Sequence, residues 1–288
     1  MICHEQPHEP ASLRAELYGG TIFLLPPTDA SRHLAADVRE RLADALGSPA
    51  FREVAHTLPN DQLFERMGAL RRELYLAPRY HAAVCDVVSD LGLDPERIAF
   101  DPLRLRVVLD RGHERPLAAP VYHPHRDTWY AHPRALLAWW IPLDDLSAEE
   151  TFEFYPNYFR KPIANDSEIF DYDDWVRDGW ELKIGWQKRS TDARFPRAEP
   201  GCDRGRALGF SCRAAENLLF SGAHFHATRP QTTGRTRFSL DFRIVDLRDH
   251  EAGLGAPDVD NRSRGSALRD YVVGPHRVSA GAKNRKPG

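Results

Sequence analysis

The residues of this sequence that could do chemistry are above all its histidines, which gather in two places. The 288-residue chain contains 13 of them. One group falls within residues 113–132, and the other is the pair His224 and His226. Imidazole nitrogens are common ligands of zinc, copper, iron and nickel in proteins. The clustering therefore indicates a metal site, with ordinary surface histidines as the alternative.

The first group contains a His-x-Asp motif. His125 and Asp127 are two residues apart, so in an extended segment their side chains point to the same side. Two imidazoles and one carboxylate form the facial ligand set that binds Fe(II) and leaves coordination positions open for other ligands. His-x-Asp supplies two of these ligands but also occurs by accident in many chains, so a third ligand must come from elsewhere.

The second histidine group offers that third ligand if a hairpin follows it. Residues 229–234 are rich in turn formers and separate two strand-like runs. A turn centred between Gln231 and Thr232 would place His226 directly opposite Arg237, on the same face. A bulge would shift this register. The ligands could then be His123 and His224, which otherwise would support the site from behind.

Arg237 and Ser239 would then lie in the same cavity as the metal. The planar fork of an arginine matches a carboxylate through two hydrogen bonds, and a serine hydroxyl can donate a further one. Together they would bind one end of a dicarboxylate whose other end chelates the metal. 2-Oxoglutarate has this chemistry. The alternative for Arg237 is a salt bridge, for example with Asp241.

The chain resembles the Fe(II)/2-oxoglutarate-dependent oxygenases of the phytanoyl-CoA dioxygenase-like superfamily, and in particular a bacterial subgroup from aminoglycoside and other natural-product pathways. The resemblance spans residues 103–245, about half of the chain, and rests on the segments 125–127, 139–145, 149–151 and 217–222 with His226 and Arg237. It implies His125, Asp127 and His226 as metal ligands and Arg237 as the co-substrate contact. The cofactors that it implies are Fe(II), 2-oxoglutarate and O2.

The activity that the resemblance implies is oxidation of an unactivated C–H bond, hydroxylation above all, with release of succinate and CO2. Asp127 keeps the carboxylate ligand, whereas related halogenases have Gly or Ala there, so halogenation is not favoured. An aromatic insertion replaces the glycine-rich stretch of the family, which argues against a fatty acyl-CoA substrate. The expected substrate is a small polar metabolite or natural-product intermediate.

Two other functions fit the same histidines. A zinc metallohydrolase could use His123, His125 and Asp127, although Thr128 stands where such hydrolases have a further histidine. A cupin-like metal-binding protein would use two His-x-His pairs, but the glutamate that usually follows the first pair is absent. Iron or zinc content would separate these readings.

Four more residues lie close to the proposed site in the sequence. Thr128 and Trp129 directly follow the carboxylate ligand and either wall the site or belong to the core. Arg104 and Arg106 lie on the strand that precedes the motif, and either contact co-substrate or substrate or point to solvent.

The elements that must position these residues predict an α+β fold with a double-stranded β-helix (jelly-roll) core and helices packed outside it. Residues 28–92 are expected to be helical, with Asp29 or Ser31 as the cap of the first helix and helices over 33–46, 61–76 and 80–91. β-Forming runs at 103–109, 119–122, 136–143, 151–155, 217–220, 223–228 and 236–245 would build the core within 103–246. In the last run, apolar and polar residues alternate, which predicts one face toward a core and one toward a cavity.

The insertion at 157–205 contains many aromatic residues, which fits either a lid over a pocket or an extra packing layer. One oxygenase domain would then span residues 1–250, and residues 251–288, rich in Gly, Arg, Asp and Pro, would form a flexible tail.

Composition excludes several partners. Lys and Arg number 39 against 42 Asp and Glu, a net charge of −3, which disfavours nucleic-acid or anionic-membrane binding. Neither a membrane-spanning apolar run nor a signal peptide is evident. The 4 cysteines form no C-x-x-C pair that would indicate a thiolate zinc site. We expect a cytoplasmic protein whose partner is a small-molecule substrate, and the sequence gives no oligomeric state.

Overall fold

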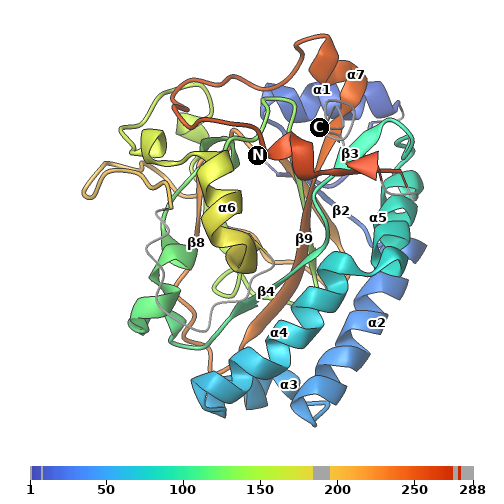
Figure 1. The fold of residues 1–288 in the computed structure, drawn as a ribbon, viewed down its shortest axis with the longest axis vertical. Helices are drawn as coiled ribbons and strands as arrows, with labels where there is room; N and C mark the ends of the chain where they lie inside the picture. The colour runs from blue at the N-terminus through green and yellow to red at the C-terminus, as the bar shows by residue number, and fades with distance from the viewer. Residues whose placement is uncertain (1, 8, 184–194, 275–277, 280–288) are drawn as a thin grey trace.

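A large sheet forms the centre of the molecule. The computed structural model describes residues 2–7, 9–183, 195–274 and 278–279 (Figure 1). Strand β9 (Arg237–Asp246) pairs with β5 (Leu137–Pro142) on one side and with β3 (Ile98–Phe100) and β4 (Arg104–Val108) on the other. Outward from β5 and β3 the sheet continues with β7 (Asn217–Ser221), β2 (Ile22–Leu25), β1 (Ile2–Cys3), β10 (Val272–Val273) and β11 (Val278–Ser279). Only the β1–β2 pair among these is parallel.

The predicted alternation along β9 is confirmed. Phe238, Leu240, Phe242 and Ile244 are 0% exposed and belong to the main hydrophobic core. Because successive side chains of a strand point to opposite faces, the polar residues between them face the other way. Three of these line a cavity: Arg237, Asp241 and Arg243.

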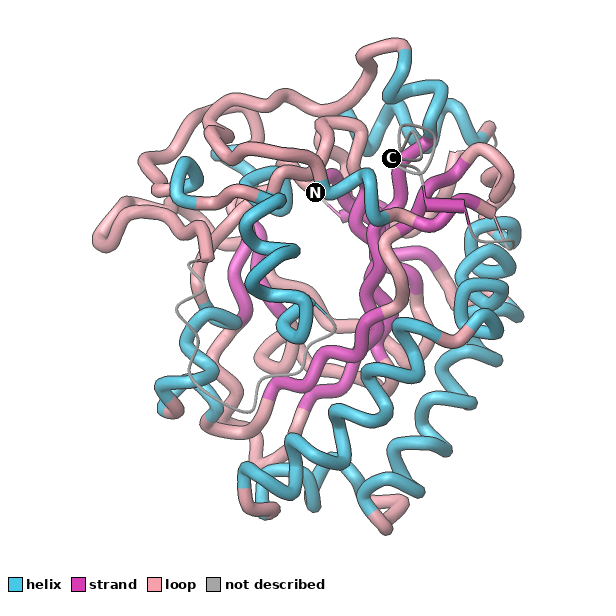
Figure 2. Tube along the Cα trace, viewed as in Figure 1, coloured by secondary structure: helices cyan, strands magenta, loops and turns pink. Residues whose placement is uncertain are grey.

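A layer of helices covers the apolar face of this sheet (Figure 2). The three predicted helices are present as α2 (Asp29–Leu46), α4 (Asn60–Leu76) and α5 (Pro78–Asp90). The cap of α2 is Thr28 rather than Asp29 or Ser31, because Thr28 Oγ1 accepts from the Ser31 N–H and Ser31 Oγ accepts from the Thr28 N–H. Helix α3 (Phe51–Val54) lies within the predicted helical part 28–92 but between the individually predicted helices, and α1 (Pro10–Gly19) lies before that part.

A small second sheet packs against the polar side of the large one. It contains β6 (Phe152–Phe154) and β8 (His226–Thr228). Aromatic rings join the two sheets: the Trp140 and Phe152 centroids are 5.4 Å apart, and those of Phe154 and Phe220 are 4.9 Å apart. The expected combination of helices with a mixed sheet is confirmed, and the two packed sheets are consistent with a jelly-roll core.

The predicted hairpin between 223–228 and 236–245 is wrong. β8 pairs with β6, because both edges of β9 are already occupied by other strands. Val108 therefore lies opposite Arg237, where His226 was expected. The strand expected at 119–122 is also wrong: Pro116–Tyr122 is a 3-10 helix, whose prolines lack the N–H that a ladder needs.

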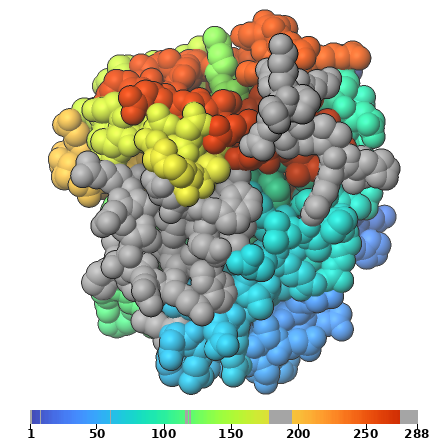
Figure 3. All heavy atoms as spheres, viewed as in Figure 1, coloured from blue at the N-terminus to red at the C-terminus, as the bar shows by residue number. Residues whose placement is uncertain are grey.

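The insertion and the C-terminal segment pack on each other. In the insertion the structure shows two short 3-10 helices and α6 (Tyr172–Lys183), whereas 184–194 lie outside the described residues. The Tyr172 N–H donates to the Arg264 carbonyl at 3.0 Å, and the two segments form one continuous surface (Figure 3). Residues 251–274 belong to the segment that was expected to be a flexible tail; in the structure the chain returns to the core after α7 (Leu247–Glu251), where Tyr271 is 1% exposed.

No helix in the described ranges combines sufficient length with a sufficiently apolar composition to cross a bilayer.

Candidate metal centre

His125, Asp127 and His226 converge at one point of the fold. One potential ligand atom of each residue lies within 4.8 Å of the others. His125 and His226 form an isolated antiparallel bridge in which each backbone N–H donates to the other carbonyl at 3.0 Å. Asp127 begins a short 3-10 helix, Asp127–Tyr130, immediately after this bridge. Segments that are 99 residues apart in the sequence thus supply one ligand set.

Both imidazoles are oriented by the backbone of the residue two positions before them. His125 Nδ1 lies 2.8 Å from the His123 carbonyl, and His226 Nδ1 lies 3.0 Å from the His224 carbonyl. Because a carbonyl only accepts, each Nδ1 carries the proton, and each Nε2 keeps a free lone pair for a metal. This is the role that the structure gives to His123 and His224: their carbonyls fix the orientation of the ligands.

The side chains of His123 and His224 do not join the cluster. The His224 ring is buried against Phe154, Phe159 and Phe220, and two of these rings, Phe154 and Phe220, also contact His226. Neither histidine contributes to the lining of the cavity described below.

Asp127 is a buried carboxylate, 3% exposed, that remains ionised. Burial acts to raise its pKa, but Arg243 together with the imidazoles of His226 and His125 holds that pKa far below the usual range. Burial and the neighbouring His226 lower the pKa of His125 to about 3, and burial lowers that of His226. Two neutral imidazoles and one carboxylate are the protonation states that metal binding requires.

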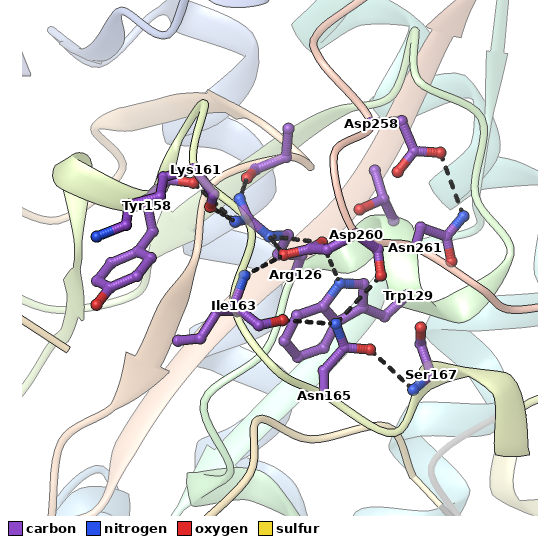
Figure 4. A network of polar contacts seen from close by, with 12 residues as sticks. Arg126, Trp129, Tyr158, Lys161, Ile163, Asn165, Ser167, Asp258, Asp260 and Asn261 are labelled. Atoms are coloured by element: carbon purple, nitrogen blue, oxygen red, sulfur yellow. Dashed lines mark hydrogen bonds and ion pairs between the residues drawn. The ribbon is translucent and has the colours of Figure 1, made fainter. Parts of the chain in front are cut away.

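Arg126, the residue between the first two ligands, anchors their loop from behind (Figure 4). It is 1% exposed, and its Nε donates to Asp260 Oδ2 at 3.1 Å. Its Nη2 donates to the carbonyls of Tyr158 at 2.7 Å and Lys161 at 2.9 Å. Trp129 Nε1 donates to the other oxygen of Asp260 at 2.8 Å. The loop that carries His125 and Asp127 is therefore bonded to both the insertion and the C-terminal segment.

Asp260 is the centre of this clamp. Its Oδ2 also accepts from the Ile163 N–H at 3.0 Å, and its backbone carbonyl accepts from Asn165 Nδ2 at 3.1 Å. Asn165 Oδ1 in turn accepts from the Ser167 N–H at 2.9 Å, as Figure 4 shows. One carboxylate from the C-terminal segment thus holds two other parts of the chain.

Gly222 allows the ligand loop to approach β7 closely. The Thr128 N–H donates to the Gly222 carbonyl at 3.3 Å. A Cβ at Gly222 would lie 2.3 Å from Leu136 Cδ2 and 3.2 Å from Asp127 Cβ. A side chain at this position would therefore displace Leu136 or Asp127.

The three ligands open into a cavity of about 610 Å³. Its walls come from α4, β4, β5, β9 and the insertion. Aromatic residues are frequent among them, and the insertion supplies Phe170, Tyr172, Trp175 and Phe195. A volume of this size is in the range of small-molecule sites. Other aromatic residues of the insertion, such as Tyr158, pack into a separate core instead.

Arg237 lines this cavity as a cation without an acidic partner among the described residues. It is 4% exposed, its Nε has no hydrogen bond, and its Nη1 reaches only the Glu150 carbonyl at 3.4 Å. Asp241, the alternative partner, binds Arg106 at 2.8 and 2.9 Å. Burial lowers the pKa of Arg237 to about 10, so the guanidinium stays charged at neutral pH.

Of the remaining candidate residues, some line the cavity and others do not. Ser239 is 0% exposed with no hydrogen-bond partner for its Oγ in the described structure, and it is not part of the cavity lining. Arg104 and Arg106 do line the cavity, in ion pairs with Asp101 and Asp241. Thr128 and Trp129 are buried outside the lining.

Several residues near the site were missed in the sequence. Arg243 contacts Asp127 and is itself held by Asp101, and Arg126 and Asp260 anchor the loop. Arg243 had a local signal, because it lies on the polar face of the alternating strand. Asp260 had none, since it lies in a segment expected to be mobile.

Comparison with known proteins yields no family model and no curated protein that matches this chain. Similar solved structures include EvdO2 from Micromonospora carbonacea var. aurantiaca complexed with 2-oxoglutarate, with a TM-score of 0.48 and 14% identity over 84% of this chain and 93% of that one. The non-heme alpha ketoglutarate dependent carbocyclase SnoK from nogalamycin biosynthesis has a TM-score of 0.43 and 13% identity over 98% and 92%. The epimerase SnoN, in complex with Fe3+, alpha ketoglutarate and nogalamycin RO, has a TM-score of 0.41 and 16% identity over 83% and 85%. These likenesses assign neither a family nor a reaction to the chain.

Proposed function

We propose that this protein is a non-haem Fe(II)- and 2-oxoglutarate-dependent oxygenase that oxidises a C–H bond of a small polar metabolite or natural-product intermediate. One observation carries the proposal: two histidines and one aspartate converge on a cavity that also holds a buried arginine without an acidic partner. The first feature fits the metal, and the second fits the distal carboxylate of the co-substrate.

The ligand set fits Fe(II) by its chemistry. His125 and His226 each present a free Nε2, and Asp127 is ionised. Two imidazoles and one carboxylate on one side of a cavity leave the remaining coordination positions open, as Fe(II) oxygenases require.

Arg237 fits a carboxylate because a buried, uncompensated cation is unfavourable. Its guanidinium carbon lies 6.0 Å from the centre of the Trp140 ring. A carboxylate bound by two hydrogen bonds would restore the missing charge partner. The second carboxylate of 2-oxoglutarate, with its neighbouring oxo group, would bind the metal.

The iron, when bound together with 2-oxoglutarate and O2, supplies the oxidising power that breaks the C–H bond and releases succinate and CO2. The chain contributes position and environment. Arg237 orients the co-substrate, and the aromatic walls, including those of the insertion, hold the substrate and exclude water. The carboxylate at Asp127 favours hydroxylation, or a related oxidation, over halogenation.

The zinc-hydrolase alternative has less support from the cavity. A hydrolase of this type needs a base beside the metal to activate water. Asp101 and Asp241 also line the cavity, but each is paired with arginines, and Thr128 is outside the lining. A cupin-like site using His224 is disfavoured because that ring lies outside both the cavity lining and the cluster of candidate ligands.

The proposal is tested by succinate formation from 2-oxoglutarate, with Fe(II) present, across a panel of amino-acid, aminocyclitol, nucleoside and acyl substrates. We expect at least one substrate to stimulate succinate release and O2 consumption together. Asp127→Ala and His226→Ala should abolish both. Tightly bound zinc with no turnover of 2-oxoglutarate would instead support the hydrolase.

A further inference from the structure

Arg243 is distinguished from the other cavity arginines by a direct contact with a proposed metal ligand. Its Nη2 and Nε donate to Asp127 Oδ1 at 2.9 and 3.3 Å. Both bonds end on the same oxygen, and in the described structure no hydrogen bond reaches Oδ2. The two oxygens of this carboxylate are therefore not equivalent.

The guanidinium of Arg243 is fixed from its other side by a second buried carboxylate. Its Nη1 donates to Asp101 Oδ2 at 3.1 Å, and the Asp101 N–H donates to the Arg243 carbonyl at 2.8 Å. Arg104 holds Asp101 in turn, at 2.9 Å. The side chains of Arg243, Asp101 and Asp127 are 11%, 5% and 4% exposed, so water does not replace these bonds readily.

We propose that Arg243 is a positioning residue that restricts Asp127 to a single metal-binding oxygen. The inference rests on the proposed function. A carboxylate can bind a metal through one oxygen or through both. With Oδ1 occupied by two N–H donors, only Oδ2 remains for the metal. If both oxygens bound, the carboxylate would close a coordination position that 2-oxoglutarate needs for its two-point attachment.

The charge of Arg243 adds a second effect with a definite sign. Arg243 lies between the carboxylates of Asp127 and Asp101 and compensates them. Without it, Asp127 would lose its cationic partner while Asp101 kept Arg104, so the uncompensated Asp127 carboxylate would attract a divalent cation more strongly. We therefore expect loss of Arg243 to separate the two affinities: metal binding is kept or strengthened, whereas 2-oxoglutarate binding is weakened.

The test uses the full chain carrying Arg243→Gln, loaded with Co(II) as a probe in place of Fe(II). Competition with a chelator gives the Kd of Co(II), and calorimetry gives the Kd of 2-oxoglutarate. The ligand-field absorption of Co(II) reports coordination number. We expect the Co(II) Kd to be equal to or below that of the wild type. The Kd of 2-oxoglutarate should rise about tenfold or more, because the Asp127 carboxylate is no longer confined to one oxygen, and the absorption should change.

Two further variants separate geometry from charge. Arg243→Lys keeps the charge but not the fork, so its Co(II) absorption should also change, with a smaller rise in the Kd of 2-oxoglutarate. Arg97→Gln is the matched control. Arg97 donates to Asp246, which lies on β9 as Arg243 does, at 2.9 and 3.1 Å, and this pair lies outside the cavity. Both affinities should be unchanged in this control.

If Arg243→Gln does not fold, Asp101→Asn serves instead, since it removes the second carboxylate that holds the arginine. We then expect a rise of about threefold in the Kd of 2-oxoglutarate, less than for Arg243→Gln, because Asp101 acts on Asp127 only through Arg243. Unchanged 2-oxoglutarate binding with unchanged absorption would overturn the inference, as would a parallel loss of metal. Failure of the wild-type Co(II) protein to bind 2-oxoglutarate would instead contradict the proposed function.

Discussion

Arg237 and Arg243 lie on the same strand and the same face, yet they have opposite surroundings. Arg243 contacts two carboxylates, whereas Arg237 contacts none in the described part of the chain. Glu150 offers Arg237 only its backbone carbonyl, because the Glu150 carboxylate binds Arg52 and Arg235. Strand periodicity alone placed both arginines at the cavity. Their partners distinguish a structural cation from one that is available to a ligand.

The largest effect on stability is expected when Arg243, the arginine with two acidic partners, is replaced. Arg243→Met leaves Asp127 and Asp101 as buried carboxylates that have lost a shared partner. Removing one member of a buried ion pair costs about 3–5 kcal/mol. We expect the free energy of unfolding of the metal-free protein, measured with denaturant, to fall by that amount. Added Co(II) should restore part of it, whereas a loss below 1 kcal/mol would show that these carboxylates are already well solvated.

The next largest effect is expected on the affinity for 2-oxoglutarate when Arg237, the arginine without an acidic partner among the described residues, is replaced. Arg237→Met removes the proposed receptor for the distal carboxylate of 2-oxoglutarate. A hydrogen bond to a charged group contributes about 1.5–3 kcal/mol, so the Kd of 2-oxoglutarate should rise by roughly 10- to 150-fold. The Kd of Co(II) should stay the same, because Arg237 does not contact the metal ligands. Equal 2-oxoglutarate affinities in wild type and variant would remove the co-substrate assignment.

Arg237→Met also tests the comparison through the free energy of unfolding. Replacing a buried, uncompensated cation by an apolar side chain of similar length is often neutral or stabilising, by about 1 kcal/mol or more. Arg237→Met should therefore unfold at an equal or higher denaturant concentration in the absence of 2-oxoglutarate. This is opposite in sign to Arg243→Met. A clear destabilisation would mean that Arg237 has a structural partner after all.

The smallest effect is expected for the ion pair between Arg106 and Asp241, a residue that lies on β9 between Arg237 and Arg243. Arg106 binds Asp241 with two hydrogen bonds, but its side chain is 43% exposed. Exposed pairs contribute about 0.2–1 kcal/mol, and salt screens them. Arg106→Gln should lower the free energy of unfolding within that range at low salt, and less at high salt. A loss as large as that of Arg243→Met would make exposure a poor guide to this cavity.

The sequence indicated the candidate residues His125, Asp127, His226 and Arg237, but not the strand pairing that brings them together. The two-residue spacing of His125 and Asp127 identified a pair that the structure brings together with His226. His226 and Arg237 do share a cavity, but through β8–β6 pairing rather than the expected hairpin. Which edge of β9 is free depends on the whole sheet, and local turn signals do not contain that information.

The supporting residues show the same limit. Asp101 and Arg243 are 142 residues apart, and Arg126 and Asp260 are 134 apart. No periodicity links such positions, and a Gly- and Pro-containing segment such as the one around Asp260 has the composition of a tail. Its burial follows from the ion pair and the indole hydrogen bond that it makes after folding.

Metal-dependent binding of 2-oxoglutarate tests the central claim most directly. Calorimetric titration of 2-oxoglutarate into the Co(II)-loaded and the metal-free wild-type protein, without O2, measures both affinities. We predict binding to the loaded protein with one site per chain, and binding at least tenfold weaker without metal. No binding to the loaded protein, or equal binding with and without metal, would contradict the assignment of His125, Asp127 and His226 with Arg237 as an Fe(II)/2-oxoglutarate site.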